Sequence, residues 1–183
     1  MPGTGTDGGA AAALAHGRII TPGTGHQLGT YGLFPPSAAQ QRILTPATAQ
    51  LTARNAEPEL LWFGFTELCG GAATGADYRA LADRHSTWVI DGVPAPQSVS
   101  VEMAAGWIRF GEAVEVLFER GRTLFLIGPR PLDWEGAAAA WRDAPVPGGA
   151  EVSAAMARTA RRLAVLVRVE SAAEEVPEGV SGS

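Results

Sequence analysis

The carboxyl end of one apolar run carries a residue that could bind a metal ion. Asp91 follows the run Thr87–Ile90, as the Mg²⁺-binding aspartate of P-loop proteins follows its strand, and it could hold Mg²⁺ beside a nucleotide phosphate. Open α/β sheets bind ligands beyond the carboxyl ends of their strands. A pocket in this chain should therefore have at its rim Asp91, Gly92, Gly128 and Arg130. The alternative is structural: Asp91 shapes the turn that leads into Pro94.

Three arginines form a second candidate group. Arg158, Arg161 and Arg162 lie in a predicted helix, and the four-residue spacing places Arg158 and Arg162 on one face. Guanidinium groups on one face could bind a phosphate or an acidic partner. The alternative is a face that is solvated or paired within the chain.

Other chemistry is limited by what the sequence lacks. All 14 basic residues are arginine, so the sequence has no lysine. A P-loop needs a lysine on the β- and γ-phosphates, and a Schiff-base enzyme needs a lysine amine. We therefore exclude both mechanisms for this chain acting alone.

Several weaker signals favour structural roles. The glycine-rich segment Gly23–Gly29 does not have the G-x-G-x-x-G spacing of a dinucleotide loop. We expect Thr24 to cap a short helix there. The three histidines have no metal-ligand spacing, so no metal site is predicted. The single cysteine, Cys69, excludes an internal disulfide and is predicted to be a buried core thiol.

Composition argues against two partner classes. The net charge of −5 argues against broad binding to nucleic acid or to an acidic membrane surface. No apolar run approaches the roughly 20 residues of a membrane span, and the N-terminus lacks the features of a signal peptide. We expect a cytoplasmic protein.

The central elements are read from apolar runs. Leu60–Phe65 and Thr87–Ile90 are predicted strands, separated by a glycine-rich turn and a helix at Asp77–Arg84. The longest helix is predicted at Ser98–Arg120, with an apolar stripe at steps of four and three residues, and it leads into a strand at Arg122–Ile127. Unbroken apolar strands joined by a helical crossover should be central and parallel.

The remaining segments complete a single α/β domain over residues 18–169. The expectation is a small mixed sheet with a central parallel pair and helices on both faces. Residues 1–17 and the acidic segment 170–183 are predicted to be disordered tails. Trp62, Trp88 and Trp107 are expected in the core, with Trp134 or Trp141 partly exposed. The other predicted elements are a hairpin of Arg42–Thr45 with Gln50–Arg54, helices at Leu132–Trp141 over the sheet edge and at Glu151–Leu163, and a strand in Ala164–Val169.

Four motifs in order resemble the C-terminal half of the ZapE-type ATPases, AAA+-like proteins of bacterial cell division with mitochondrial relatives. The motifs are Phe63-Gly-Phe65-Thr-Glu-Leu68-Cys69, Asp77-Tyr78-x-x-Leu81-Ala82, the strand that reaches Val93-Pro94, and Arg158-Thr159-Ala160-Arg161-Arg162-Leu163. The last motif has Arg161 where the family has serine. The resemblance spans roughly residues 17–169.

The resemblance implies an ATPase relative without its nucleotide-binding motifs. Walker A, Walker B and the arginine finger of that family have no counterpart in this sequence. We therefore expect a non-catalytic protein-interaction module, linked to cell division or membrane-associated quality control, with no cofactor of its own. One alternative is a subunit that completes an ATPase in trans: a partner would supply the P-loop for ATP and Mg²⁺, and Arg158 and Arg162 would contact the nucleotide domain. A third is an unrelated small-ligand enzyme that uses the strand ends near Asp91.

Overall fold

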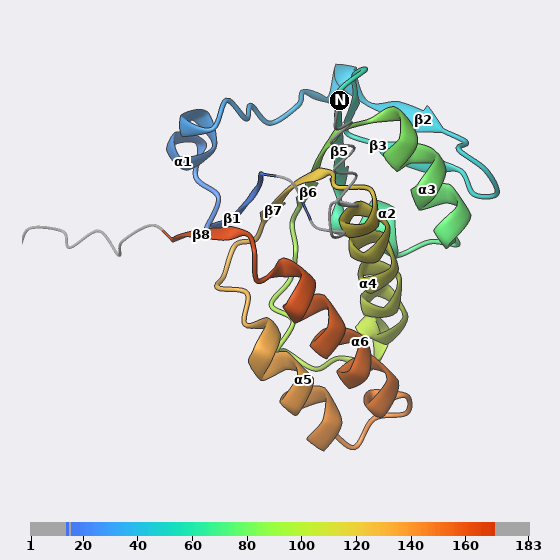
Figure 1. Ribbon diagram of the computed structural model, residues 1–183, viewed down its shortest axis with the longest axis vertical. Helices are drawn as coiled ribbons and strands as arrows, with labels where there is room; N and C mark the ends of the chain where they lie inside the picture. The colour runs from blue at the N-terminus through green and yellow to red at the C-terminus, as the bar shows by residue number, and fades with distance from the viewer. Residues whose placement is uncertain (1–13, 15, 171–183) are drawn as a thin grey trace, which may run out of the picture.

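The computed structural model describes residue 14 and residues 16–170 as one α/β unit (Figure 1). A six-stranded sheet has the order β4-β5-β6-β7-β1-β8, and β2 and β3 form a separate hairpin. The six strands of the sheet are β1 (Arg18–Thr21), β4 (Asn55–Ala56), β5 (Leu60–Gly64), β6 (Thr87–Asp91), β7 (Thr123–Ile127) and β8 (Val167–Glu170). The hairpin strands are β2 (Arg42–Leu44) and β3 (Leu51–Ala53). The helices are α1 (Gly25–Thr30), α2 (Phe65–Cys69), α3 (Gly75–Arg84), α4 (Ala104–Glu119), α5 (Trp134–Asp143) and α6 (Gly149–Leu163).

The predicted central parallel pair is confirmed. Strand β6 pairs in parallel with β7, with Ile90 opposite Leu126, and β5 pairs in parallel with β6. Helix α4 connects β6 to β7 across one face of the sheet. Strand β4 pairs antiparallel with β5, so the sheet is mixed, as its sequence predicts.

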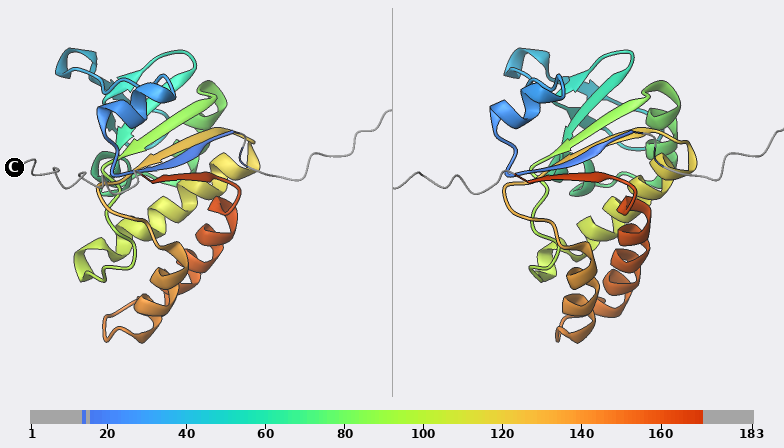
Figure 2. Two further views of the ribbon diagram at one scale, coloured as in Figure 1. Left: turned by 90° about the vertical axis from the view of Figure 1, so that its left-hand side faces the viewer. Right: turned by 60° about the vertical axis from the view of Figure 1, so that its left-hand side comes forward.

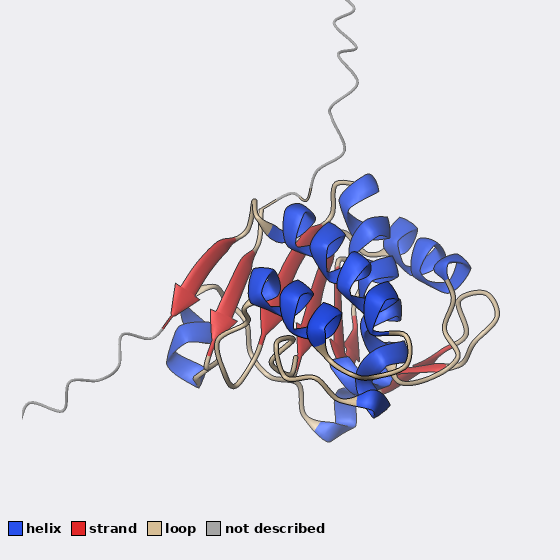
Figure 3. Cartoon of the chain, turned by 90° about the horizontal axis from the view of Figure 1, so that it is seen from below, coloured by secondary structure: helices blue, strands red, loops and turns tan. Residues whose placement is uncertain are grey.

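Helices cover both faces of the sheet, but unequally. Helices α4, α5 and α6 lie on one face and the short α1 on the other (Figure 2). From below, the larger helical layer lies in front of the strands (Figure 3). On the α1 face, Leu28 and Leu33 pack against Ile20, Trp62 and Val89. Both faces of the central strands are therefore buried, which explains their unbroken apolar sequences.

Four local predictions need correction. The segment after β5 forms the helix α2, whereas the sequence predicts only a strand and a turn there. The long helix begins at Ala104, after a 3₁₀ turn at Val101–Met103. Trp134 and Trp141 are both buried, and Trp134 stacks on Phe110 of α4 at 5.3 Å between ring centroids. Helix α5 therefore packs on other helices rather than over the sheet edge.

Other elements agree with expectation. The hairpin β2–β3 forms, Thr24 caps α1 in a capping box with Gln27, and the helix predicted at Glu151–Leu163 is α6. The predicted tails fall mostly on residues 1–13, 15 and 171–183, which lie outside the described residues.

Candidate functional site

Helix α6 packs against α4, and both lie with α5 in the lower part of the molecule as Figure 1 shows it. The reason for the close packing is Gly111, because a Cβ at this position would lie 3.2 Å from the Thr159 hydroxyl oxygen. The apolar stripe of α4, including Trp107 and Phe110, faces the core. The face of α4 that points away from the core lies next to α6 and next to the start of α3.

This arrangement creates a large cavity beside α4. It has a volume of about 730 Å³ and lies between the start of α3, the first half of α4 and the start of α6. Its apolar surface comes from small side chains and Ile108: Ala72, Ala73, Ala104, Ala105 and Val152. A second cavity of about 240 Å³ adjoins it along α4 and shares Ile108 and Glu112. We call the two cavities together the α4 groove.

Two of the predicted site residues meet in the α4 groove. Arg158 and Arg162 both line the smaller cavity. Arg162 forms an ion pair with Glu115 of α4 at 3.5 Å, which supports the intramolecular alternative for that residue. Arg158 is exposed and has no ion-pair partner among the residues that the structure describes. The arginine pair therefore has one member paired within the chain and one available to a partner.

The remaining charges of the α4 groove come from α4 and α6. Glu112 and Glu151 are exposed at its rim. Arg109 also lines it, and its Nη1 donates a hydrogen bond to the Cys69 carbonyl oxygen at 3.2 Å. That carbonyl lies at the C-terminal end of α2, where a cation interacts favourably with the helix dipole. The sequence places Arg109 and Glu112 on one helix face, but only the fold shows that α6 runs beside them.

Asp91 lies elsewhere and is occupied by interactions within the chain. Its Oδ2 accepts a hydrogen bond from Arg54 at 3.2 Å, and its Oδ1 accepts one from the Gly92 N–H at 2.6 Å. Arg54 also contacts Glu67 at 3.9 Å, and its guanidinium crosses over Gly64, where a Cβ would lie 2.7 Å from Arg54 Nη2. The turn-shaping alternative for Asp91 agrees with this geometry.

Arg130 lies in a third place. It is exposed and lines a cavity of about 300 Å³ that also includes Ser98, Ser100 and Trp107. Asp91, Gly92 and Gly128 do not line this cavity, so the expected pocket rim does not form as a unit. The four predicted site residues thus occupy three places, and the fold brings together only Arg158 and Arg162.

The Asp77 motif has a structural role. Asp77 is completely buried and accepts six hydrogen bonds, without a cation beside it in the described residues. One oxygen accepts from the N–H groups of Ala47, Thr48 and Ala49, and the other accepts from the Thr74 N–H and from the Thr48 and Thr74 hydroxyls. Burial acts to raise the pKa of this carboxyl, but the hydrogen bonds outweigh burial and hold the pKa well below 3.8. Asp77 therefore fastens the loop after the β2 strand to the start of α3.

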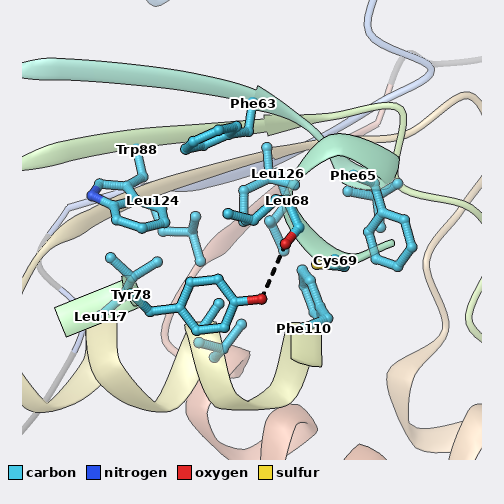
Figure 4. Close-up of a cluster of buried hydrophobic side chains, with 14 of the residues drawn as sticks. Phe63, Phe65, Leu68, Cys69, Tyr78, Trp88, Phe110, Leu117, Leu124 and Leu126 are labelled. Carbon is cyan, nitrogen blue, oxygen red and sulfur yellow. Dashed lines mark hydrogen bonds between the residues drawn. The ribbon is translucent and has the colours of Figure 1, made fainter. Parts of the chain in front are cut away.

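The neighbouring motif residues also belong to the core (Figure 4). The Tyr78 hydroxyl donates to the Leu68 carbonyl oxygen at 3.0 Å and so joins α3 to α2. Cys69 is completely buried, as predicted. Burial raises the pKa of its thiol, and the Arg109 charge offsets only part of that effect. A neutral buried thiol is a poor nucleophile, so these residues offer no catalytic group.

Two further findings concern metal ions and membranes. Within residues 16–170, no three His, Cys, Asp or Glu side chains are arranged to hold a metal ion. No helix of the described chain has the length and apolar character needed to cross a membrane.

Comparison with known proteins gives one result. The family model of the AFG1-like ATPases matches residues 27–174, which is most of the chain. No curated protein and no solved structure matches. The matched region contains both the Asp77–Tyr78 motif and the arginine pair of the α4 groove. The chain belongs to the AFG1-like ATPase family.

Proposed function

We propose that this chain is a protein-interaction module of the AFG1-like family that does not hydrolyse ATP by itself. A protein partner binds in the α4 groove. The processes that we expect for it are cell division or membrane-associated quality control, because the ZapE-type resemblance implies them.

The observation that carries the proposal is the character of the α4 groove. The groove is partly open to solvent, and the lining of its larger cavity is mostly apolar. Its charged rim includes Arg158, Glu112 and Glu151, which have no ion pairs within the described residues. Small-molecule sites enclose most of their ligand, whereas an apolar centre with a charged rim is typical of protein interfaces. The absence of lysine from the sequence supports the non-catalytic part, since no P-loop lysine is available.

Calorimetry tests the proposal that the chain does not act on ATP by itself. Titration of the purified chain with Mg-ATP should give no binding heat at micromolar protein concentration. Tight binding would overturn the proposal, because it would require a phosphate site that uses no lysine.

Matched variants test the proposal that a protein partner binds in the α4 groove. Ala105→Trp fills the larger cavity, and Arg158→Glu reverses the unpaired charge of the smaller one. The controls are Ala154→Trp and Arg161→Glu, which change exposed residues of α6 outside the α4 groove. A partner isolated from the native host should bind wild type and both controls and should lose affinity for both groove variants. Equal binding to all five proteins would contradict a partner site in the α4 groove.

A second function is favoured by the exposed Arg158. In that case the chain completes an ATPase in trans, and the arginines contact the nucleotide domain of a subunit that carries a Walker A lysine. Mixing the chain with such a subunit, encoded beside it, should raise the ATPase rate. Replacing Arg158 and Arg162 with alanine should abolish the increase while circular dichroism stays unchanged, and Arg161→Ala should keep it. If the double variant stimulates as wild type does, the arginines have no such role.

A further inference from the structure

Strand β8 forms an edge of the six-stranded sheet. It pairs in parallel with β1 on one side, and no described strand pairs with its other side. Figure 3 shows this strand as the outermost one on its side of the sheet. The opposite edge strand, β4, has two residues, whereas β8 has four. The outward N–H and C=O groups of β8 are therefore the longer set of strand-pairing groups left open in the described sheet.

The exposed side chains of β8 indicate which kind of strand could pair with it. Val167, Arg168 and Glu170 are exposed, and Val167 shows 54% of its surface. Because side chains alternate along a strand, Arg168 and Glu170 share one face of the sheet, while Val167 and Val169 share the other. An edge strand with charges of a single sign would repel a second copy of itself. A strand with one charge of each sign, two residues apart, is complementary to itself in a single antiparallel register.

We propose that β8 is a self-association edge, which pairs antiparallel with β8 of a second copy of this chain. If the two copies are related by a two-fold axis perpendicular to the sheet, side chains opposite one another lie on the same face of the joined sheet. The alternative registers of the two strands therefore differ by two residues. With Val169 opposite Val169 of the second copy, Arg168 lies opposite Glu170 of the second copy, and this ion pair occurs twice. A shift in either direction sets Arg168 against Arg168 or Glu170 against Glu170. The charges therefore select one register, and the two sheets join into one.

The contact between the two β8 strands is small, so we expect a low affinity for the dimer. Stable interfaces bury at least about 1,200 Å², more than four residues of a strand can supply. The dimer should accordingly be weak, and it should form as the protein concentration rises. It is also independent of the α4 groove, which lies between helices on one face of the sheet.

The test is sedimentation equilibrium of the full chain over a concentration series, with five samples besides wild type. Arg168→Glu and Glu170→Arg each place like charges opposite one another, so each should weaken the dimer by about tenfold or more. The double variant Arg168→Glu/Glu170→Arg restores opposite charges and should dimerise as wild type does. An equal mixture of the two single variants should form a heterodimer, because each supplies the charges that the other lacks. Arg161→Glu on α6 is the control and should not affect association.

Folding does not obscure these results, because both substituted side chains are exposed and the double variant contains both changes. Concentration-dependent dimerisation that follows this charge pattern would support the proposal. Wild-type protein that stays monomeric at millimolar concentration would overturn it. A dimer that ignores the single charge reversals, or that the double variant fails to restore, would overturn it as well.

Discussion

The buried carboxylate of Asp77 gives the sharpest stability prediction. In Asp77→Asn, one carbonyl oxygen remains to accept from Ala47, Thr48 and Ala49, but an NH₂ group replaces the oxygen that accepts from the Thr74 N–H. The Thr48 and Thr74 hydroxyls can rotate to accept from that NH₂, whereas the Thr74 N–H cannot. Losing a hydrogen bond to a charged group costs about 1.5–3 kcal/mol, and the three retained bonds lose their charge assistance. We expect a total loss of roughly 3 kcal/mol.

Chemical and thermal denaturation measure this loss. For a chain of this size, about 3 kcal/mol corresponds to a Tm decrease of roughly 6–12 °C. Asp83→Asn is the matched control: it lies on the same helix, is exposed, and has Arg120 as its ion-pair partner. It should cost under about 1 kcal/mol. If the two variants are equally stable, the six hydrogen bonds to Asp77 do not contribute to the free energy of unfolding as expected.

The same residue predicts a dependence on pH. The folded-state pKa of Asp77 is lowered, so the unfolded chain binds the proton more readily than the folded chain. Its stabilising effect is therefore complete above the unfolded pKa of about 3.9 and decreases as pH falls below that value. The stability difference between wild type and Asp77→Asn should be constant from pH 7 to about 5 and should shrink below about pH 4. A difference that stays constant to pH 3 would show that the carboxylate charge contributes nothing.

Three further predictions concern the core around this site. Tyr78→Phe removes the hydrogen bond to the Leu68 carbonyl and should cost about 1–2 kcal/mol in urea denaturation, with α3 still formed; an unchanged midpoint would contradict the bond's role. The Cys69 thiol should not react with a thiol reagent in the native protein and should react fully in denaturant, since it is buried and neutral; rapid native labelling would refute its burial. Gly111→Leu should push α6 from α4 and cost about 1–3 kcal/mol, whereas Gly25→Ala, with open space around it, should have little effect.

Much of the sheet could be predicted because its signal is local. The strands around Ile90 and Ile127 are continuous apolar runs, and the periodic stripe between them predicts the crossover helix and hence their parallel pairing. The sequence does not predict helix α2, because Phe65 and Leu68 extend the apolar run of β5 and periodicity alone cannot show where the strand ends. The sequence does not predict the burial of Trp134, because its own segment is polar and the rings that cover it come from α4.

The sequence by itself determined that this chain has no lysine for a P-loop, that its central strands are covered on both faces, and that Arg158 and Arg162 share a helix face. Only the tertiary structure decided where these pieces meet. In the folded chain, β1 lies between β7 and β8. Arg162 forms an ion pair with Glu115, and Arg54 forms one with Asp91. The physical reason is that composition and spacing act within one segment, whereas ion pairs, grooves and strand order depend on contacts between segments distant in sequence.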